Sequence, residues 1–214
     1  MERGVAPIFP LPIFLDEARD DEYVKIQKEL TSVKNELKFN DTGRNMILNN
    51  NPFGSNFLIH KKCDNTINLI RNTVDKFLKS LYGDCDGNKL LKNNWDIEES
   101  WMTKTIKGRC ARQHNHGLAD ISGVYYLDTN GNDGNLVLCN IHNQLQCNML
   151  LYDLISCGDV KMPLKNGMIF LWPGQIKHYT LENETDHERV SVSFNIFLNR
   201  KDIDYSGMKW TFHH

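Results

Sequence analysis

The chain has 214 residues, of which 40% are hydrophobic and 24% are charged, and its formal net charge is −2 at pH 7. This length and balance are typical of a globular domain and exclude a disordered chain. The near-neutral charge gives no electrostatic argument for nucleic-acid binding. Since no apolar run approaches the roughly 20 residues that span a bilayer, we expect no membrane insertion.

The N-terminal half predicts an extended segment followed by two helices. Prolines alternate with large apolar residues over 6–15, which suits an edge strand because proline cannot donate to a sheet. Apolar residues recur at helical spacing over 20–38 and again over 64–81. The intervening residues 39–56 are rich in asparagine and glycine, so we expect a loop there.

From Trp95 onward the pattern changes to short β-rich runs separated by turn residues. The predicted strands are 97–106, 121–127, 135–141, 148–155, 168–172, 177–181 and 189–198. Short strands at this spacing, without intervening helical patterns, favour an antiparallel sandwich or barrel over a parallel α/β sheet. The expected fold class is therefore mainly β, with flanking helices.

Two histidines precede the second of these strands, in the stretch RQHNHGLADISGVYYL. Because residues i and i+2 of an extended backbone point to the same face, His114 and His116 can converge on one point. His178 opens a later strand, and neutral imidazoles bind iron and zinc. The three histidines predict a metal site with open coordination positions.

Arg189 begins the last strand, with Ser191 and Ser193 on the same face. A buried guanidinium is costly without an anion, and it can clamp a carboxylate with two hydrogen bonds. Ser191 could add a hydroxyl donor. The alternative is an exposed arginine that pairs with Glu188 or Asp186.

The order and spacing of these motifs resemble those of the iron(II)- and 2-oxoglutarate-dependent oxygenases. The pattern is closest to a subgroup found in bacteria and phages. The motifs are His114-x-His116, Ser122-Gly123-Val124-Tyr125-Tyr126, His178, and Arg189-x-Ser191-x-Ser193-Phe194-Asn195. The resemblance is strongest over 101–197 and weaker before.

The resemblance implies one oxygenase domain over residues 1–214. Its core would be a double-stranded β-helix, a jelly-roll-like barrel, over 95–200. Residues 1–94 would supply the extended segment and the two supporting helices, and 201–214 would form a C-terminal tail. With scattered cysteines and no export signal, we expect a cytoplasmic protein, in the host cytoplasm if the chain is phage-encoded.

The resemblance also implies site roles and cofactors. His114 and His178 would bind Fe(II), and Arg189, helped by Ser191, would bind the far carboxylate of 2-oxoglutarate. Tyr125 or Tyr126 would meet the cosubstrate, but only one of them can, since neighbours on a strand face opposite sides. With O₂ as the other cosubstrate, oxidative decarboxylation to succinate would be coupled to oxidation of a C–H bond, with hydroxylation as the default outcome.

The chain departs from the superfamily pattern at position 116, where a histidine replaces the usual carboxylate ligand. Either His116 is a third imidazole ligand, or Asp120 supplies the carboxylate, or His116 lies beside the ligands without binding the metal. We expect His116 to be the ligand.

Two other functions remain open from the sequence. A cupin-type enzyme, a three-histidine dioxygenase or isomerase, would bind the same metal without 2-oxoglutarate. A non-catalytic jelly-roll module would use the histidines for a structural metal, to which Cys110 could add a ligand, or for no metal at all. The substrate could be a small molecule or a protein side chain such as proline, and a homodimer is one option for the assembly.

Overall fold

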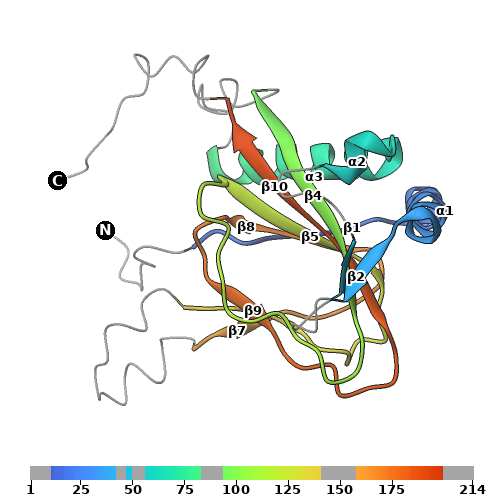
Figure 1. Ribbon diagram of the computed structural model, residues 1–214. Helices are drawn as coiled ribbons and strands as arrows, with labels where there is room; N and C mark the ends of the chain where they lie inside the picture. Colours follow the sequence, from blue (N-terminus) through green and yellow to red (C-terminus); the bar gives the residue numbers. More distant parts are fainter. Residues whose placement is uncertain (1–10, 42–46, 50–55, 83–93, 141–157, 200–214) are drawn as a thin grey trace, which may run out of the picture.

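The computed structural model describes residues 11–41, 47–49, 56–82, 94–140 and 158–199, and Figure 1 shows the arrangement of their helices and strands. In chain order the elements are β1 (Phe14–Glu17), α1 (Asp20–Glu36), β2 (Phe39–Asp41), β3 (Ile47–Asn49), α2 (Phe57–His60), α3 (Asp64–Tyr82), β4 (Trp95–Thr105), β5 (Ile121–Asp128), β6 (Leu136–Leu138), β7 (Val160–Lys161), β8 (Met168–Pro173), β9 (His178–Thr180) and β10 (Arg189–Leu198). No helix of this described part is long and apolar enough to cross a membrane.

The strands form two antiparallel sheets. The larger sheet has the order β1-β8-β5-β10-β4-β3-β2, and the smaller has the order β7-β6-β9. Crossovers such as β8-β5-β10-β4 make neighbours of strands that are distant in the chain. The two sheets form the predicted double-stranded β-helix, and the mainly β fold class is confirmed.

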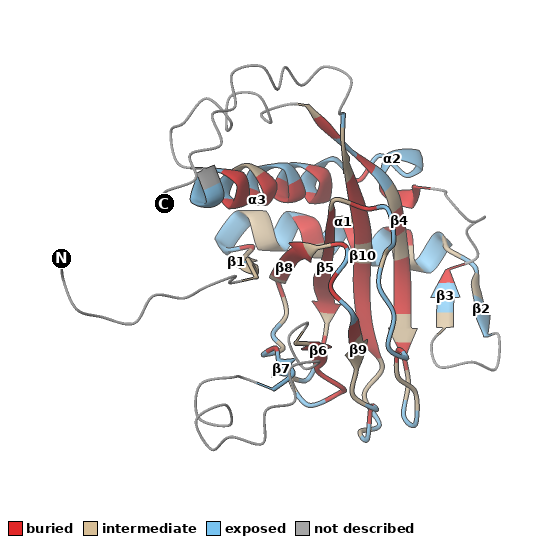
Figure 2. Ribbon diagram, turned by 90° about the vertical axis from the view of Figure 1, so that its left-hand side faces the viewer, coloured by how far each residue is buried: buried red, intermediate tan, exposed pale blue. Residues whose placement is uncertain are grey.

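The large sheet is covered on one face by helices (Figure 2). Ile26 and Leu30 of α1 and Ile70 of α3 are completely buried, in the same apolar core as the strand residues of this face. A second apolar core, including Val124 and Phe170, fills the space between the sheets. The large sheet is therefore buried on both faces, which explains why β5 is buried almost throughout and does not alternate between buried and exposed residues.

Strand β10 presents a different chemistry to each core. Its apolar side chains, Val190, Val192, Phe194 and Ile196, pack into the core beneath the helices. The alternate side chains, Arg189, Ser191, Ser193 and Asn195, belong to the opposite face, between the sheets. The two-residue period of side chains along a strand predicted this separation. The separation places a row of polar groups inside the barrel.

The prediction of a loop over 39–56 is wrong in part, because β2 and β3 form an antiparallel pair within it. β3 joins the large sheet through pairs of Ile47 with Lys104 and of Leu48 with Thr103. The Asn49 side chain also accepts a hydrogen bond from the Met102 amide at 2.5 Å. Pairing with an available sheet edge outweighs the local preference of asparagine for turns.

Two more strand predictions have different outcomes, and one short strand was not predicted. The predicted edge segment 6–15 is confirmed only in part: residues 11–13 are not in a strand, whereas Phe14 and Leu15 begin β1, which pairs with β8 at the end of the large sheet. Strand β7 was not predicted because two residues are too short to show a period. The predicted strand 148–155 lies outside the described residues.

Gly123 is a position where a methyl group should destabilise the fold. A Cβ at this residue would overlap the Phe194 ring and lie 2.8 Å from Leu171 Cδ2. We expect Gly123→Ala to cost about 1–3 kcal/mol of unfolding free energy through overpacking. Thermal unfolding followed by circular dichroism should show a Tm lower by several degrees. Gly158→Ala is the control, because a methyl group at that residue would meet no atom of the described residues within 4 Å. Equal Tm values for the two variants would contradict the packing argument.

Candidate metal centre

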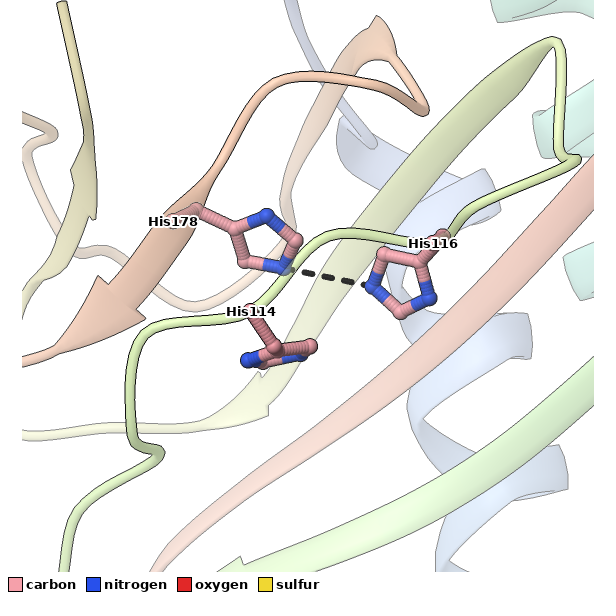
Figure 3. A group of neighbouring side chains, drawn as sticks. All are labelled: His114, His116 and His178. Atoms are coloured by element: carbon pink, nitrogen blue, oxygen red, sulfur yellow. Dashed lines mark hydrogen bonds between the residues drawn. The ribbon is translucent and has the colours of Figure 1, made fainter.

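Three histidines from two separate segments meet between the sheets (Figure 3). The backbones of His114 and His178 form a reciprocal bridge, with N–H to carbonyl distances of 2.9 and 2.8 Å. The His116 amide donates to the Gly174 carbonyl at 3.0 Å, which ties the loop to the turn before β9. As a result, one ring nitrogen of each histidine lies within 4.8 Å of the others.

The outward nitrogens of two rings face backbone carbonyls. His114 Nδ1 lies 2.6 Å from the Arg112 carbonyl oxygen, and His178 Nδ1 lies 3.0 Å from that of Ile176. A carbonyl only accepts, so each Nδ1 carries the proton and each Nε2 keeps its lone pair. This arrangement is the one found for metal-binding histidines.

Burial keeps the two inner imidazoles neutral. It lowers the pKa of His116 from 6.5 to about 3, with smaller contributions from His178 and His114. Burial also lowers the pKa of His178 to about 4, against an opposing hydrogen bond to the Ile176 backbone. Neutral imidazole is the form that binds a metal, so protons do not compete for these nitrogens near neutral pH.

These low pKa values predict acid sensitivity of the metal-free protein. Between pH 6.5 and about 4, the unfolded chain binds protons at His116 and His178 that the folded chain does not. The unfolding free energy should therefore decrease as the pH falls from 6.5 to about 4. Above pH 6.5 both histidines are neutral in the folded and the unfolded chain, and this loss of stability is absent. Urea unfolding at several pH values tests this. The double variant His116→Gln/His178→Gln should have a flatter profile than the native chain, and parallel profiles would contradict the assignment.

Asp120 is not placed to complete the metal site. Its carboxylate Oδ2 accepts a hydrogen bond from the Leu198 amide at 2.8 Å. Among the described residues, the group of possible ligand atoms around this point contains only His114, His116 and His178. The structure therefore does not support Asp120 as the third ligand, and Cys110 is also outside this group of ligand atoms.

Arg189 is 2% exposed and lines the same cavity as the three histidines. Nη1 donates to the Asp133 carbonyl at 3.0 Å, and Nη2 donates to Thr105 Oγ1 at 3.1 Å. Its Nε has no hydrogen-bond partner within the described structure. Among the described residues, the guanidinium donates only to neutral groups and no carboxylate lies within ion-pair distance of it, which favours an anionic ligand.

The alternative of an exposed arginine paired with a neighbouring carboxylate is wrong. Glu188 lies 3.5 Å from Lys104 Nζ, and Asp186 lies 2.9 Å from Lys107 Nζ. The neighbouring acidic side chains are directed to lysines instead.

The two tyrosines of β5 have different surroundings. Tyr126 lines the cavity, whereas Tyr125 packs in the core beneath the helices. Burial raises the pKa of Tyr126 to about 12, and the charge of Arg189 opposes this shift. The phenol that faces the cavity is therefore that of Tyr126.

The remaining wall of the cavity comes from both sheets. Ser191 and Ser193 follow Arg189 on the same face of β10 and line the cavity. Trp101 and Trp172 flank the histidines, with ring-centroid distances of 5.4 Å to His116 and 5.0 Å to His178. Sequence reasoning did not predict the contact of Thr105 with Arg189. The alternation of β4, which places Trp101, Thr103 and Thr105 on one face, is the signal that could have found it.

A larger hollow of about 770 Å³ lies elsewhere, between the start of α1 and residues 129–131 and 164–166. It is open to solvent, and no described histidine or cysteine lines it. The three histidines and Arg189 therefore belong to the smaller cavity.

Comparison with known proteins agrees with this geometry. Residues 99–195 match the family described as "Putative 2OG-Fe(II) oxygenase". This segment begins in β4 and ends in β10, so it includes the three histidines and Arg189. No curated protein matches the sequence.

Several solved structures are similar despite low sequence identity. The alpha-ketoglutarate-dependent epimerase SnoN from nogalamycin biosynthesis has a TM-score of 0.61 at 12% identity, over 87% of this chain and 78% of that one. HygX from Streptomyces hygroscopicus, solved with nickel and 2-oxoglutarate bound, has a TM-score of 0.58 at 11% identity, over 89% and 84%. A Pseudomonas putida prolyl-4-hydroxylase has a TM-score of 0.56 at 13% identity, over 87% and 92%. The chain thus has the double-stranded β-helix fold of these structures, and its segment 99–195 matches the 2OG-Fe(II) oxygenase family.

Proposed function

We propose that this protein is an Fe(II)- and 2-oxoglutarate-dependent dioxygenase that hydroxylates a C–H bond of its substrate. The observation that carries the proposal is the buried guanidinium of Arg189, which has no carboxylate partner among the described residues and lies in the cavity that the three histidines line. A dicarboxylate that chelates a metal held by the imidazoles with one end would place its other carboxylate at the guanidinium, so one molecule would satisfy both groups. The family match over 99–195 supports the same conclusion.

The donor set fits a ferrous ion with open coordination positions. Three imidazole nitrogens within 4.8 Å of one another can occupy one face of the coordination sphere of such an ion, and imidazole is a common ligand of iron. His114, His178 and His116 would be the ligands. The bound iron would supply the activation of O₂ that couples decarboxylation of 2-oxoglutarate, giving succinate and CO₂, to substrate oxidation.

The cavity residues would position the cosubstrate. The unused donors of Arg189 would clamp the carboxylate far from the metal, and Ser191 would add its hydroxyl. Tyr126 would donate its phenol from the neighbouring strand, protonated because burial raises its pKa to about 12. Val124, Leu136 and Trp172 would exclude water from this end of the cavity.

The substrate is a small molecule or a protein side chain. Both classes occur among the structural neighbours, which include an epimerase of nogalamycin biosynthesis and a prolyl-4-hydroxylase.

The test is to titrate 2-oxoglutarate into the iron-loaded protein under nitrogen and then to admit O₂. We expect a weak visible charge-transfer band on titration and formation of succinate after O₂ is added. Mass spectrometry of candidate substrate mixtures should then show additions of 16 mass units. An iron-loaded protein that gives neither the band nor succinate contradicts the proposal.

A second candidate is a three-histidine metal enzyme that does not use 2-oxoglutarate. The all-imidazole donor set favours it, since it departs from the usual two histidines and one carboxylate. The same titration separates the two candidates, because this enzyme would bind iron and show no band with 2-oxoglutarate.

A further inference from the structure

Asn195 is a buried polar residue beside the metal centre, and the proposed reaction does not use it directly. It is 3% exposed and contacts three side chains. Ser122 Oγ donates to its Oδ1 at 2.9 Å, and its Nδ2 lies 2.6 Å from Glu99 Oε2. The same Nδ2 lies 3.3 Å from His116 Nδ1.

The three contacts fix the orientation of the Asn195 amide. A carboxylate has only acceptors, so the amide NH₂ must face Glu99. The Ser122 hydroxyl can donate, so the amide oxygen is satisfied on the other side. The second N–H of Asn195 is then directed at His116 Nδ1.

This orientation makes His116 different from the other two histidines. Its Nδ1 accepts a hydrogen bond, so the neutral ring carries its proton on Nε2, 3.2 Å from His178 Nε2 (Figure 3). His114 and His178 instead donate from Nδ1 to carbonyl oxygens and keep Nε2 unprotonated. Only His116 is thus held in the form whose inward nitrogen cannot bind a metal directly.

We propose that Asn195, oriented by Glu99, is a positioning residue that makes His116 the weakest and most readily displaced of the three metal ligands. The inference rests on the proposed function, because it concerns the same metal. To bind through Nε2, His116 must move its proton to Nδ1, where it meets an N–H donor. Turning the amide over would relieve this conflict but would set Oδ1 against the Glu99 carboxylate.

A displaceable third imidazole has a functional consequence. It gives the site a coordination position that the substrate or cosubstrate can take without competing for His114 or His178. The unusual residue at position 116 is then an adjustable ligand rather than a simple replacement of the carboxylate.

The test exchanges the two functional groups in the double variant Glu99→Gln/Asn195→Asp, which preserves net charge. The new carboxylate would accept from Ser122, from the new glutamine and from His116 Nδ1–H. Such a carboxylate–histidine–metal arrangement typically changes metal affinity by about 10–100-fold. Titration with Co²⁺ alone should therefore give a Kd lower by this factor than for the native chain.

His116→Ala is the matched control in both backgrounds. In the native background it should weaken Co²⁺ binding less than His114→Ala or His178→Ala does. In the exchanged background it should abolish the gain. An equal loss for all three alanine variants, or a folded exchange variant without tighter binding, would overturn the inference.

A second measurement does not depend on metal or on the variants. ¹⁵N NMR of the metal-free native protein reports which ring nitrogen of each histidine carries the proton. We expect Nε2–H for His116 and Nδ1–H for His114 and His178, and Nδ1–H at His116 would overturn the inference. A native chain that binds no Co²⁺ would instead contradict the proposed function, so the two failures are distinguishable.

Discussion

Replacing His178 by alanine should remove metal binding and 2-oxoglutarate turnover together. His178 is 5% exposed, its Nδ1 faces the Ile176 carbonyl, and its Nε2 lies 3.2 Å from His116 Nε2. Loss of a direct ligand should exceed the 10–100-fold effect typical of residues that only support a ligand. We therefore expect a Kd for Co²⁺ or Fe²⁺ raised by more than about 100-fold and no detectable succinate.

The control for this prediction is His60→Ala. His60 is exposed on the short helix α2 and does not line the cavity. Metal titration and succinate formation should be unchanged in this variant. If His178→Ala kept native metal affinity while remaining folded, the metal would have to bind elsewhere.

Replacing Arg189 by alanine should remove 2-oxoglutarate binding but leave the metal in place. A carboxylate clamped by a guanidinium gains about 1.5–3 kcal/mol per hydrogen bond, so two lost bonds correspond to about a 100- to 20,000-fold higher Kd. Arg189→Lys keeps the charge but loses the planar fork, so it should lie between alanine and the native residue. Anaerobic titration of the iron-loaded variants with 2-oxoglutarate measures both changes.

The matched control is Arg109→Ala. The Arg109 guanidinium pairs with Asp41 at 3.1 Å and does not line the cavity. This variant should bind 2-oxoglutarate as the native chain does. A folded Arg189→Ala variant with native 2-oxoglutarate affinity would contradict the carboxylate clamp, while loss of metal in that variant would point to a collapsed site rather than a lost contact.

The pairing of these results is more informative than either alone. His178→Ala should lose metal and cosubstrate, since the cosubstrate needs the metal to bind at its other end. Arg189→Ala should lose only the cosubstrate. In a cupin-type enzyme that does not use 2-oxoglutarate, His178→Ala would still lose the metal. Arg189→Ala would have no specific effect on 2-oxoglutarate binding in such an enzyme.

The amino-acid sequence alone determined the period of the strands and hence the class of fold. Alternation along 189–198 placed Arg189 and Ser191 on one face, and the i, i+2 spacing allowed His114 and His116 to converge. These features are local, because the side-chain period of an extended backbone depends only on neighbouring residues. Turn residues likewise marked the gaps between most of the strands.

Only the tertiary structure decided which face of each strand is covered and which elements cover it. Tyr125 and Tyr126 are equivalent in a local pattern, and the helices on one side of the sheet place Tyr126 in the cavity. The contact of Asp120 with the Leu198 amide depends on packing between segments 78 residues apart in the chain. The link from Glu99 through Asn195 to His116 joins β4, β10 and a loop, so sheet order and register create it. No sequence period encodes such contacts, because they arise where distant strands become neighbours.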